Sequence, residues 1–321
     1  MSLDQKIAEM LQFSNQYYMN VNIFIMVIQG LSIITNGFII ILFISSKRLQ
    51  RNTALRLILL LCVTDWLFAV TTIPYVVQYI VNWNAVEFNY DGILVITLSL
   101  PLTVQFKVNL IITTAIALDR YQAMHFSMHY RTKNHNLFVF YTLLLGIILS
   151  LVDVYFEYAL DPLPVNTKCA AVGCFTSLKF RLYWGSTNLA LSFVLLFITA
   201  LVGRELCNLN QPEVLSNPEA KPDQNANRLS MAILIIALTF QTIPSMLVGI
   251  SDLFGLNSFQ KLGPFYIVGL LLCGLCNSIV YIALHLELKT AAKRFLRLIP
   301  NEIKVATVSY STPHSRMTRF H

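Results

Sequence analysis

The chain has 321 residues, of which 56% are hydrophobic and 12% are charged, and its formal net charge is +7. Because soluble domains carry about 25% charged residues, this composition excludes an ordinary soluble protein. The basic residues lie at the ends of apolar blocks rather than in one long run, so membrane topology explains the charge better than nucleic-acid binding does.

Seven apolar blocks follow one another along the chain, many of them near the roughly 20 residues that a helix needs to cross a bilayer. Open sheet edges cannot survive in hydrocarbon, and barrel strands are shorter and alternate in polarity. We therefore expect helices at 21–45, 54–80, 92–118, 137–160, 182–203, 229–252 and 263–285. The predicted fold is an all-α membrane protein, a seven-transmembrane helix bundle.

The regions outside this seven-transmembrane domain, 21–285, are short. Residues 1–20 lack a basic-then-apolar signal peptide and are predicted to form an extracellular N-terminus. Residues 286–299 separate apolar from basic positions, which predicts a short amphipathic interfacial helix after the last span, although a straight continuation of that span is the alternative. Residues 300–321 are the predicted cytoplasmic tail.

Lysine and arginine favour one side of the predicted bundle. They gather after the first, third, fifth and seventh blocks, whereas the other side has few. Because basic loops stay in the cytoplasm, the N-terminus should lie outside and the tail inside. We expect a multi-pass protein of the plasma membrane.

Charged residues within a span are costly, so each is a candidate functional residue. Asp153 and Glu157 are four residues apart and share one helical face. We expect Lys107 to pair with one of them and to form, with Gln241, the polar floor of an outward-facing ligand pocket. The plain alternative is that these groups are satisfied structural residues of the bundle interior.

A set of motifs occurs in register with the predicted spans. The third block ends in LIITTAIALDRY, with the triplet Asp119-Arg120-Tyr121 at its last turn. The other motifs are Asn36 in the first block, Leu61-x-x-x-Asp65 and Pro74 in the second, Pro244 in the sixth, and Asn277-Ser278-Ile279-Val280-Tyr281 in the seventh. Together they resemble the rhodopsin-like G-protein-coupled receptor superfamily, over about residues 20–300.

Some departures from that pattern point to one branch of the superfamily. No cysteine occurs at the start of the third block, and Ser278 stands where proline is usual. The segments CAAVGCF, FRLYWGSTN and GPFYIVGLLLCGLCNS resemble the nematode chemosensory serpentine receptors, with class BC as the best match. A local disulfide between Cys169 and Cys174 is the candidate replacement for the usual loop-to-helix bond.

The resemblance implies a mechanism. Asp119 would restrain Arg120 at rest, and Arg120 would meet a G protein when the sixth helix swings outward at its Pro244 kink. Tyr281 would move inward to support the open state, and Tyr121 and Asn277 are the remaining residues of the predicted switch. Asn277 would also form a polar core and a candidate cation site with Asn36, Asp65 and Asn109.

The expected function is a chemoreceptor that binds a small environmental or pheromone-like ligand outside and activates a heterotrimeric G protein inside. Its expected partners are the ligand, the G protein and the lipid bilayer, with no nucleic acid, cofactor or metal. The nematode resemblance adds the sensory cilium as a candidate location.

Two alternative functions remain open, and a third, an enzyme, is not favoured by the sequence. One alternative is a neuropeptide receptor, and the other is an ion-coupled transporter with Asp65, Lys107 and Asp153 as an ion or proton relay. The missing internal repeat counts against a transporter. An enzyme is not expected, because the loop histidines come without an H-E-x-x-H helix or a nucleophile elbow.

Overall fold

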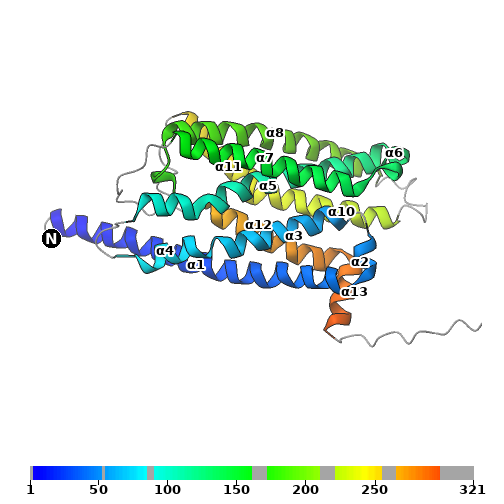
Figure 1. Cartoon of the computed structure of the whole chain (residues 1–321), viewed down its shortest axis with the longest axis horizontal. Coiled ribbons are helices and arrows are strands. Elements are labelled where there is room, and N and C mark those ends of the chain that lie inside the picture. The colour runs from blue at the N-terminus through cyan, green and yellow to red at the C-terminus, as the bar shows by residue number, and fades with distance from the viewer. Residues whose placement is uncertain are drawn as a thin grey trace, which may run out of the picture.

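A computed structural model of the chain describes residues 3–52, 55–84, 90–160, 172–209, 221–254 and 265–296 (Figure 1). This part of the chain contains seven helices that are long and apolar enough to cross a membrane: Gln16–Ser45, Arg56–Val81, Gly92–His125, His135–Leu160, Leu178–Cys207, Ala226–Ile250 and Phe265–Leu284. The predicted seven-helix, all-α fold is confirmed.

The elements follow the chain in a simple order. They are α1 (Leu3–Ser45), α2 (Lys47–Arg51), α3 (Arg56–Thr71), α4 (Ile73–Val81), α5 (Gly92–His125), α6 (Ser127–Thr132), α7 (His135–Leu160), η2 (Val172–Cys174), α8 (Leu178–Leu209), α10 (Lys221–Ala237), η4 (Leu238–Thr242), α11 (Ile243–Leu253), α12 (Phe265–Leu284) and α13 (Leu286–Phe295). Helices α3 and α4 make the second span, and α10, η4 and α11 make the sixth.

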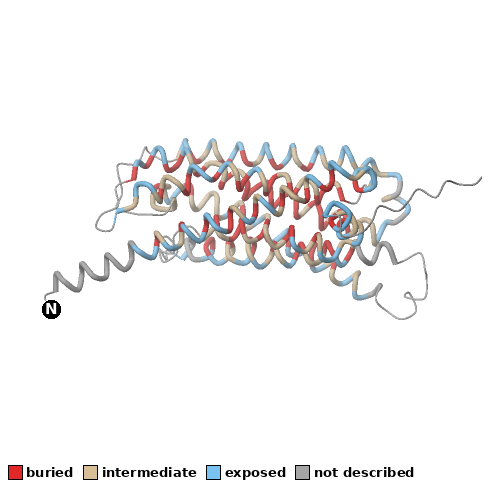
Figure 2. The backbone as a smooth tube through the Cα atoms, turned by 90° about the horizontal axis from the view of Figure 1, so that it is seen from below, coloured by how far each residue is buried: buried red, intermediate tan, exposed pale blue. Residues whose placement is uncertain are grey.

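Helix α5 is the central element of the bundle. In its most apolar window 72% of residues are buried, more than in any other described span. It packs against α3, α7, α8 and α10, while α1 packs against α3 and α12. Figure 2 shows the buried residues along the middle of the bundle and the exposed residues on its outer faces. Polar side chains on α5 therefore lie in the bundle interior, where they need partners.

The second span is interrupted at Thr72, two residues before Pro74. Proline has no backbone N–H, so a break here leaves carbonyl groups without their helical donors. The amide of Gln29 on α1 donates to the Ala69 carbonyl at 2.7 Å and to the Thr72 hydroxyl at 2.9 Å. A neighbouring helix thus stabilises the break, as is usual within a membrane.

The sixth span is interrupted by the π-helical turn η4, just before Pro244. Proline at 244 cannot donate to the carbonyl of Phe240, four residues earlier. Helix α12 approaches that carbonyl closely, since a Cβ atom built on Gly269 would lie 2.5 Å from the Phe240 oxygen. Because π turns often mark functional hinges, the segment from Leu238 to Pro244 is the candidate hinge of this span.

We expect Gly269→Ala to lower the free energy of unfolding by about 1–3 kcal/mol, because its methyl group would force the α12 and η4 backbones apart. Thermal unfolding of the purified protein in detergent measures the effect. Gly30→Ala is the matched control, since a Cβ there meets nothing within 4 Å. Equal melting temperatures for the two variants would contradict a tight contact at Gly269.

The last span ends at Leu284, and α13 follows as a separate helix across the end of the bundle, beside α2 (Figure 1). Leu288 and Ala292 are buried, whereas Lys289 and Lys293 are exposed. The helix after the last span is therefore amphipathic, as predicted, and does not continue that span. We call the end of the bundle at which α2 and α13 lie the α13 end.

Two of the predicted domain limits, after residues 20 and 285, fall within the described residues. Helix α1 begins at Leu3 and shows no break near residue 21. Helix α13 ends at Phe295. Residues 297–299, and the predicted tail at 300–321, lie outside the described residues.

Candidate functional site

The Asp119–Arg120 pair lies at the α13 end of α5. An Arg120 Nη2 atom lies 2.7 Å from Asp119 Oδ2, and both side chains are buried. The hydroxyl of Tyr130, from α6, donates to Asp119 Oδ2 at 3.0 Å and accepts from Arg120 at 3.4 Å. A buried ion pair with an added hydrogen bond is well placed to hold Arg120 in one orientation.

Two further basic side chains surround Asp119. Lys133 Nζ lies 3.6 Å from Asp119 Oδ1, and His135 Nδ1 lies 3.9 Å from the same oxygen. Lys133 also donates to Gln122 at 2.8 Å and lies 3.3 Å from the centre of the Phe138 ring. Burial lowers the pKa of Lys133, and the attraction of Asp119 opposes that shift. Asp119 is thus the anion shared by two cationic side chains, Arg120 and Lys133, and it also faces the His135 imidazole.

Two more of the predicted switch residues, Tyr121 and Tyr281, have other neighbours. The ring of Tyr121 stacks on His125, with 5.4 Å between the ring centres. Tyr281 is fully buried, and its hydroxyl has no hydrogen-bond partner among the described residues. A buried hydroxyl without a partner costs free energy, so this residue would gain by moving to a position with an acceptor or water.

Asp65 lies at the middle of the predicted polar core. Its Oδ1 atom accepts from Gln105 at 2.9 Å and from Asn109 at 3.2 Å. The structure thus brings Asp65 and Asn109 together, and it adds Gln105, which sequence reasoning missed. Gln105 and Asn109 are four residues apart on α5, so a shared helical face was the signal that could have found it.

Asn36 and Asn277 have other direct partners. Asn36 donates to the Ser32 carbonyl at 3.1 Å and to the Gly274 carbonyl at 3.4 Å. The Asn277 amide lies 3.7 Å from Cys273 Sγ. Neither hydrogen bond reaches Asp65, although a Cβ atom on Gly274 would lie 3.0 Å from Asp65 Cγ. The glycine therefore allows α12 to lie directly against the carboxylate.

Four buried oxygens of these residues have no hydrogen-bond partner among the described residues: Asn36 Oδ1, Asp65 Oδ2, Asn109 Oδ1 and Asn277 Oδ1. Carboxylate and amide oxygens suit hard cations and ordered water. In the described part of the chain no group of three His, Cys, Asp or Glu residues forms a metal cluster. The oxygens present fit a weakly held cation or buried water.

Lys107 forms the polar junction of three helices. Its Nζ atom lies 3.1 Å from Asp153 Oδ2 on α7 and donates to Thr187 on α8 at 3.2 Å. Tyr183 on α8 donates to the other Asp153 oxygen at 3.1 Å. The Lys107 and Asp153 side chains are each 2% exposed, so this ion pair is closed to solvent.

The other two predicted pocket residues have different partners. Glu157 accepts from Thr103 at 3.0 Å. Gln241, on η4, donates to the Phe106 carbonyl at 2.9 Å. Of the two carboxylates that sequence reasoning left open for Lys107, the partner is therefore Asp153.

An aromatic cluster lies beside Gln241. The Phe106 ring is 5.0 Å from Trp184 and 5.6 Å from Tyr266, in tilted and edge-to-face contacts. The indole nitrogen of Trp184, both polar atoms of Asn188 and the Gln241 oxygen are buried without a hydrogen-bond partner among the described residues. Unpaired buried groups of this kind are what a bound ligand or ordered water satisfies.

The comparisons with known proteins place the chain in a family. A family model described as "Serpentine type 7TM GPCR chemoreceptor Srbc" matches residues 15–287, which is most of the chain. The chain belongs to the Srbc family. The resemblance to class BC serpentine receptors is therefore confirmed.

Solved structures support the fold of this Srbc chain. The crystal structure of squid rhodopsin has a TM-score of 0.62 and 15% sequence identity, and the match covers 88% of this chain and 86% of that chain. No curated protein matches the chain. Family and fold together make this a multi-pass membrane protein of the G-protein-coupled receptor type, which favours a receptor over a transporter.

Of the two cysteines in the predicted disulfide of this Srbc chain, only Cys174 lies within the described residues. Cys174 is disulfide-bonded. The other cysteines of the described part, Cys62, Cys207, Cys273 and Cys276, are free. The predicted partner, Cys169, lies outside the described residues.

Proposed function

We propose that this Srbc receptor binds a small environmental or pheromone-like molecule between its helices and activates a heterotrimeric G protein at its α13 end. The proposal includes a plasma-membrane location with the N-terminus outside, and a sensory cilium as the candidate site of action. The Asp119–Arg120 pair carries the proposal, because it is a buried ion pair near the end of α5, and we propose that it has two positions. In one position Arg120 is held by Asp119, and in the other it is free to contact a partner.

The candidate ligand site lies among α5, α8, η4 and α12. Its walls would be the aromatic cluster of Phe106, Trp184 and Tyr266, and its polar groups Gln241 and Asn188. A ligand activates only if it binds the open state more tightly than the closed one. A ligand that hydrogen-bonds to Gln241 would act on η4 directly, next to the candidate hinge at Pro244.

The buried Lys107–Asp153 pair lies on the same helices, α5 and α7, and reaches α8 through Thr187 and Tyr183. In this proposal it positions the three helices around the ligand site. Glu157 on α7 likewise helps to position α5, because it accepts a hydrogen bond from Thr103.

G-protein dissociation in cells tests the proposal. Cells that express the receptor are challenged with fractionated metabolite extracts, beside cells that express Arg120→Ala at matched surface level. We expect Arg120→Ala to abolish the response, and Arg204→Ala, an exposed arginine on α8, to retain it. A response that is equal in the native chain and in Arg120→Ala would overturn the role of Arg120.

A further inference from the structure

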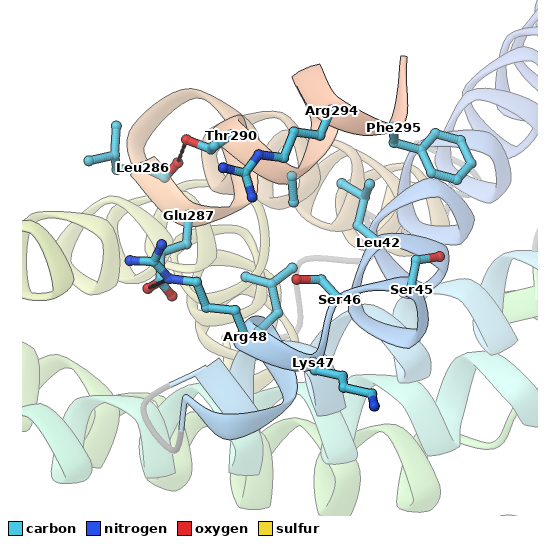
Figure 3. Close-up of a pocket in the computed structure, with 12 residues that line it drawn as sticks. Leu42, Ser45, Ser46, Lys47, Arg48, Leu286, Glu287, Thr290, Arg294 and Phe295 are labelled. Carbon is cyan, nitrogen blue, oxygen red and sulfur yellow. Dashed lines mark hydrogen bonds and ion pairs between the residues drawn. The ribbon is translucent and has the colours of Figure 1, made fainter. Parts of the chain in front are cut away.

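A cavity of about 490 Å³ lies at the α13 end, between the end of α1, α2 and α13 (Figure 3). Its volume is in the range of small-molecule sites, roughly 300–1,000 Å³. None of its lining residues belongs to the Asp119–Arg120 pair, the polar core or the candidate ligand site described above. The cavity therefore needs an explanation of its own.

Most of the charged residues that line the cavity are basic. The basic ones are Lys47 and Arg48 from α2 and Arg294 from α13, against a single acid, Glu287. Figure 3 shows Arg48, from α2, and Arg294, from α13, both extending toward the side of the view where Glu287 lies, whereas Lys47 points away from them. Two arginines that line one cavity favour an anion with several oxygens, because guanidinium groups bind phosphate oxygens in pairs.

The one acid is already engaged. Glu287 Oε1 lies 3.0 Å from Arg48 Nε, and Glu287 Oε2 accepts from Asn52 Nδ2 at 3.0 Å. These two contacts tie the α1–α3 connection to α13 and hold Arg48 at the cavity. The Arg48 side chain is 76% exposed, so it remains open to a further anion. Glu287 acts here as a positioning residue.

Three hydroxyl groups also line the cavity, those of Ser45, Ser46 and Thr290. The Thr290 hydroxyl already donates to the Leu286 carbonyl at 2.8 Å, which leaves the two serines. Ser46 precedes α2, but its side chain makes no capping hydrogen bond to that helix. Its hydroxyl is therefore available as a donor to an anion.

The surroundings of the cavity are apolar and exposed. Ile44, the residue before Ser45, is 71% exposed, and Phe295 of α13 is 50% exposed. The Phe295 ring packs edge to face against Phe38 on α1, with 5.9 Å between the ring centres. The cavity thus lies where the apolar face of the first span meets the basic end of the bundle, which is the level of lipid headgroups.

We propose that this cavity binds a phosphate-bearing anion, with Arg48 and Arg294 as its two main ligands and the serine hydroxyls as further donors. A phosphorylated headgroup of the adjacent lipid leaflet and a soluble inositol phosphate share this chemistry. The lipid would place its headgroup in the cavity and its acyl chains along Ile44 and Phe295. Basic pockets beside membrane helices bind phosphoinositide headgroups in this way.

The test is a binding measurement on the purified full-length receptor in phosphatidylcholine nanodiscs that contain phosphatidylinositol bisphosphate. We expect the double variant Arg48→Gln with Arg294→Gln to bind this lipid about tenfold or more weakly than the native chain. Lys289→Gln with Lys293→Gln is the matched control, since it removes the same charge from exposed positions of α13 that do not line the cavity.

The comparison of the two pairs decides the proposal. A larger loss for the arginine pair supports the site, whereas equal losses would show only diffuse attraction to the basic end and would overturn it. Arg294→Gln alone leaves the Arg48–Glu287 contact in place, so it serves if the double variant unfolds. A single variant that binds as tightly as the native chain would also overturn the site.

Competition with soluble inositol trisphosphate distinguishes the two sources of the anion. Competition at matched concentration assigns a soluble anion to the site, and a clear preference for the lipid assigns the headgroup. Both outcomes keep the cavity as an anion site. Because the measurement uses neither agonist nor G protein, its failure is distinguishable from a failure of the proposed signalling function.

Discussion

Lys107→Ala is expected to lower the free energy of unfolding of this receptor by about 3–5 kcal/mol, because it leaves the carboxylate of Asp153 buried without its counter-ion. The ion pair measures 3.1 Å, and both side chains are almost fully buried. Thermal unfolding of the purified protein in detergent gives the measurement. Lys179→Ala removes an exposed lysine of α8 and should leave the melting temperature close to that of the native chain.

A double variant separates the ion pair from simple loss of packing. Lys107→Met with Asp153→Leu removes both charges and keeps the side-chain volume near the original. Since replacing a buried ion pair with apolar residues is often close to neutral, we expect most of the stability to return. The hydroxyls of Tyr183 and Thr187 would lose their charged partners, so the recovery should be incomplete. A double variant as unstable as the sum of the two single changes would contradict the coupling.

Hydropathy was enough to predict the bundle, because the bilayer sets the length of each span and forces its backbone groups to pair within the helix. The limits of the helices were harder to predict. The first span was expected from residue 21, yet the apolar span begins at Gln16, within a helix α1 that starts at Leu3. The segment before residue 21 contains no proline or glycine that would end a helix, so the change from polar to apolar composition is not a structural boundary.

The Asp119-Arg120-Tyr121 triplet could be found from its sequence, but the partners of Asp119 could not. These partners are Tyr130 on α6, Lys133 just after α6 and His135 at the start of α7. In the sequence, basic residues at such positions indicate only the orientation in the membrane. Their contact with Asp119 depends on how the chain folds back after α5. Only the packed structure shows that two cationic side chains and an imidazole surround this carboxylate.

The glycines of α12 are a second example of residues whose packing role cannot be predicted from the composition. In the sequence, Gly269 and Gly274 lie within an apolar block and resemble small residues that face the lipid. In the bundle, Gly269 lets α12 lie against the Phe240 carbonyl and Gly274 lets it lie against Asp65. Small residues at helix contacts allow backbones to approach, and the position of each contact is set by tertiary packing.

Asp119→Asn is expected to raise signalling without ligand by about tenfold, since hydrogen bonds to a charged group contribute about 1.5–3 kcal/mol and every 1.4 kcal/mol is a tenfold change in a population. Asp119 is the anion that holds Arg120 at 2.7 Å and that also faces Lys133 and His135. With a neutral amide in its place, the closed position of Arg120 loses its counter-charge, and the cations around it repel one another. The population therefore shifts toward states in which Arg120 points elsewhere.

Basal G-protein dissociation at matched surface level measures this shift. Tyr130→Phe removes one hydrogen bond to Asp119 and keeps the charge, so its rise in basal signalling should be smaller. Glu205→Gln is the charge-matched control, because Glu205 is also an acid at the α13 end but pairs with His125 at 3.6 Å. If Asp119→Asn signals no more than Glu205→Gln does, the ion pair does not hold the resting state, and Arg120 must be restrained by its contacts with α6 instead.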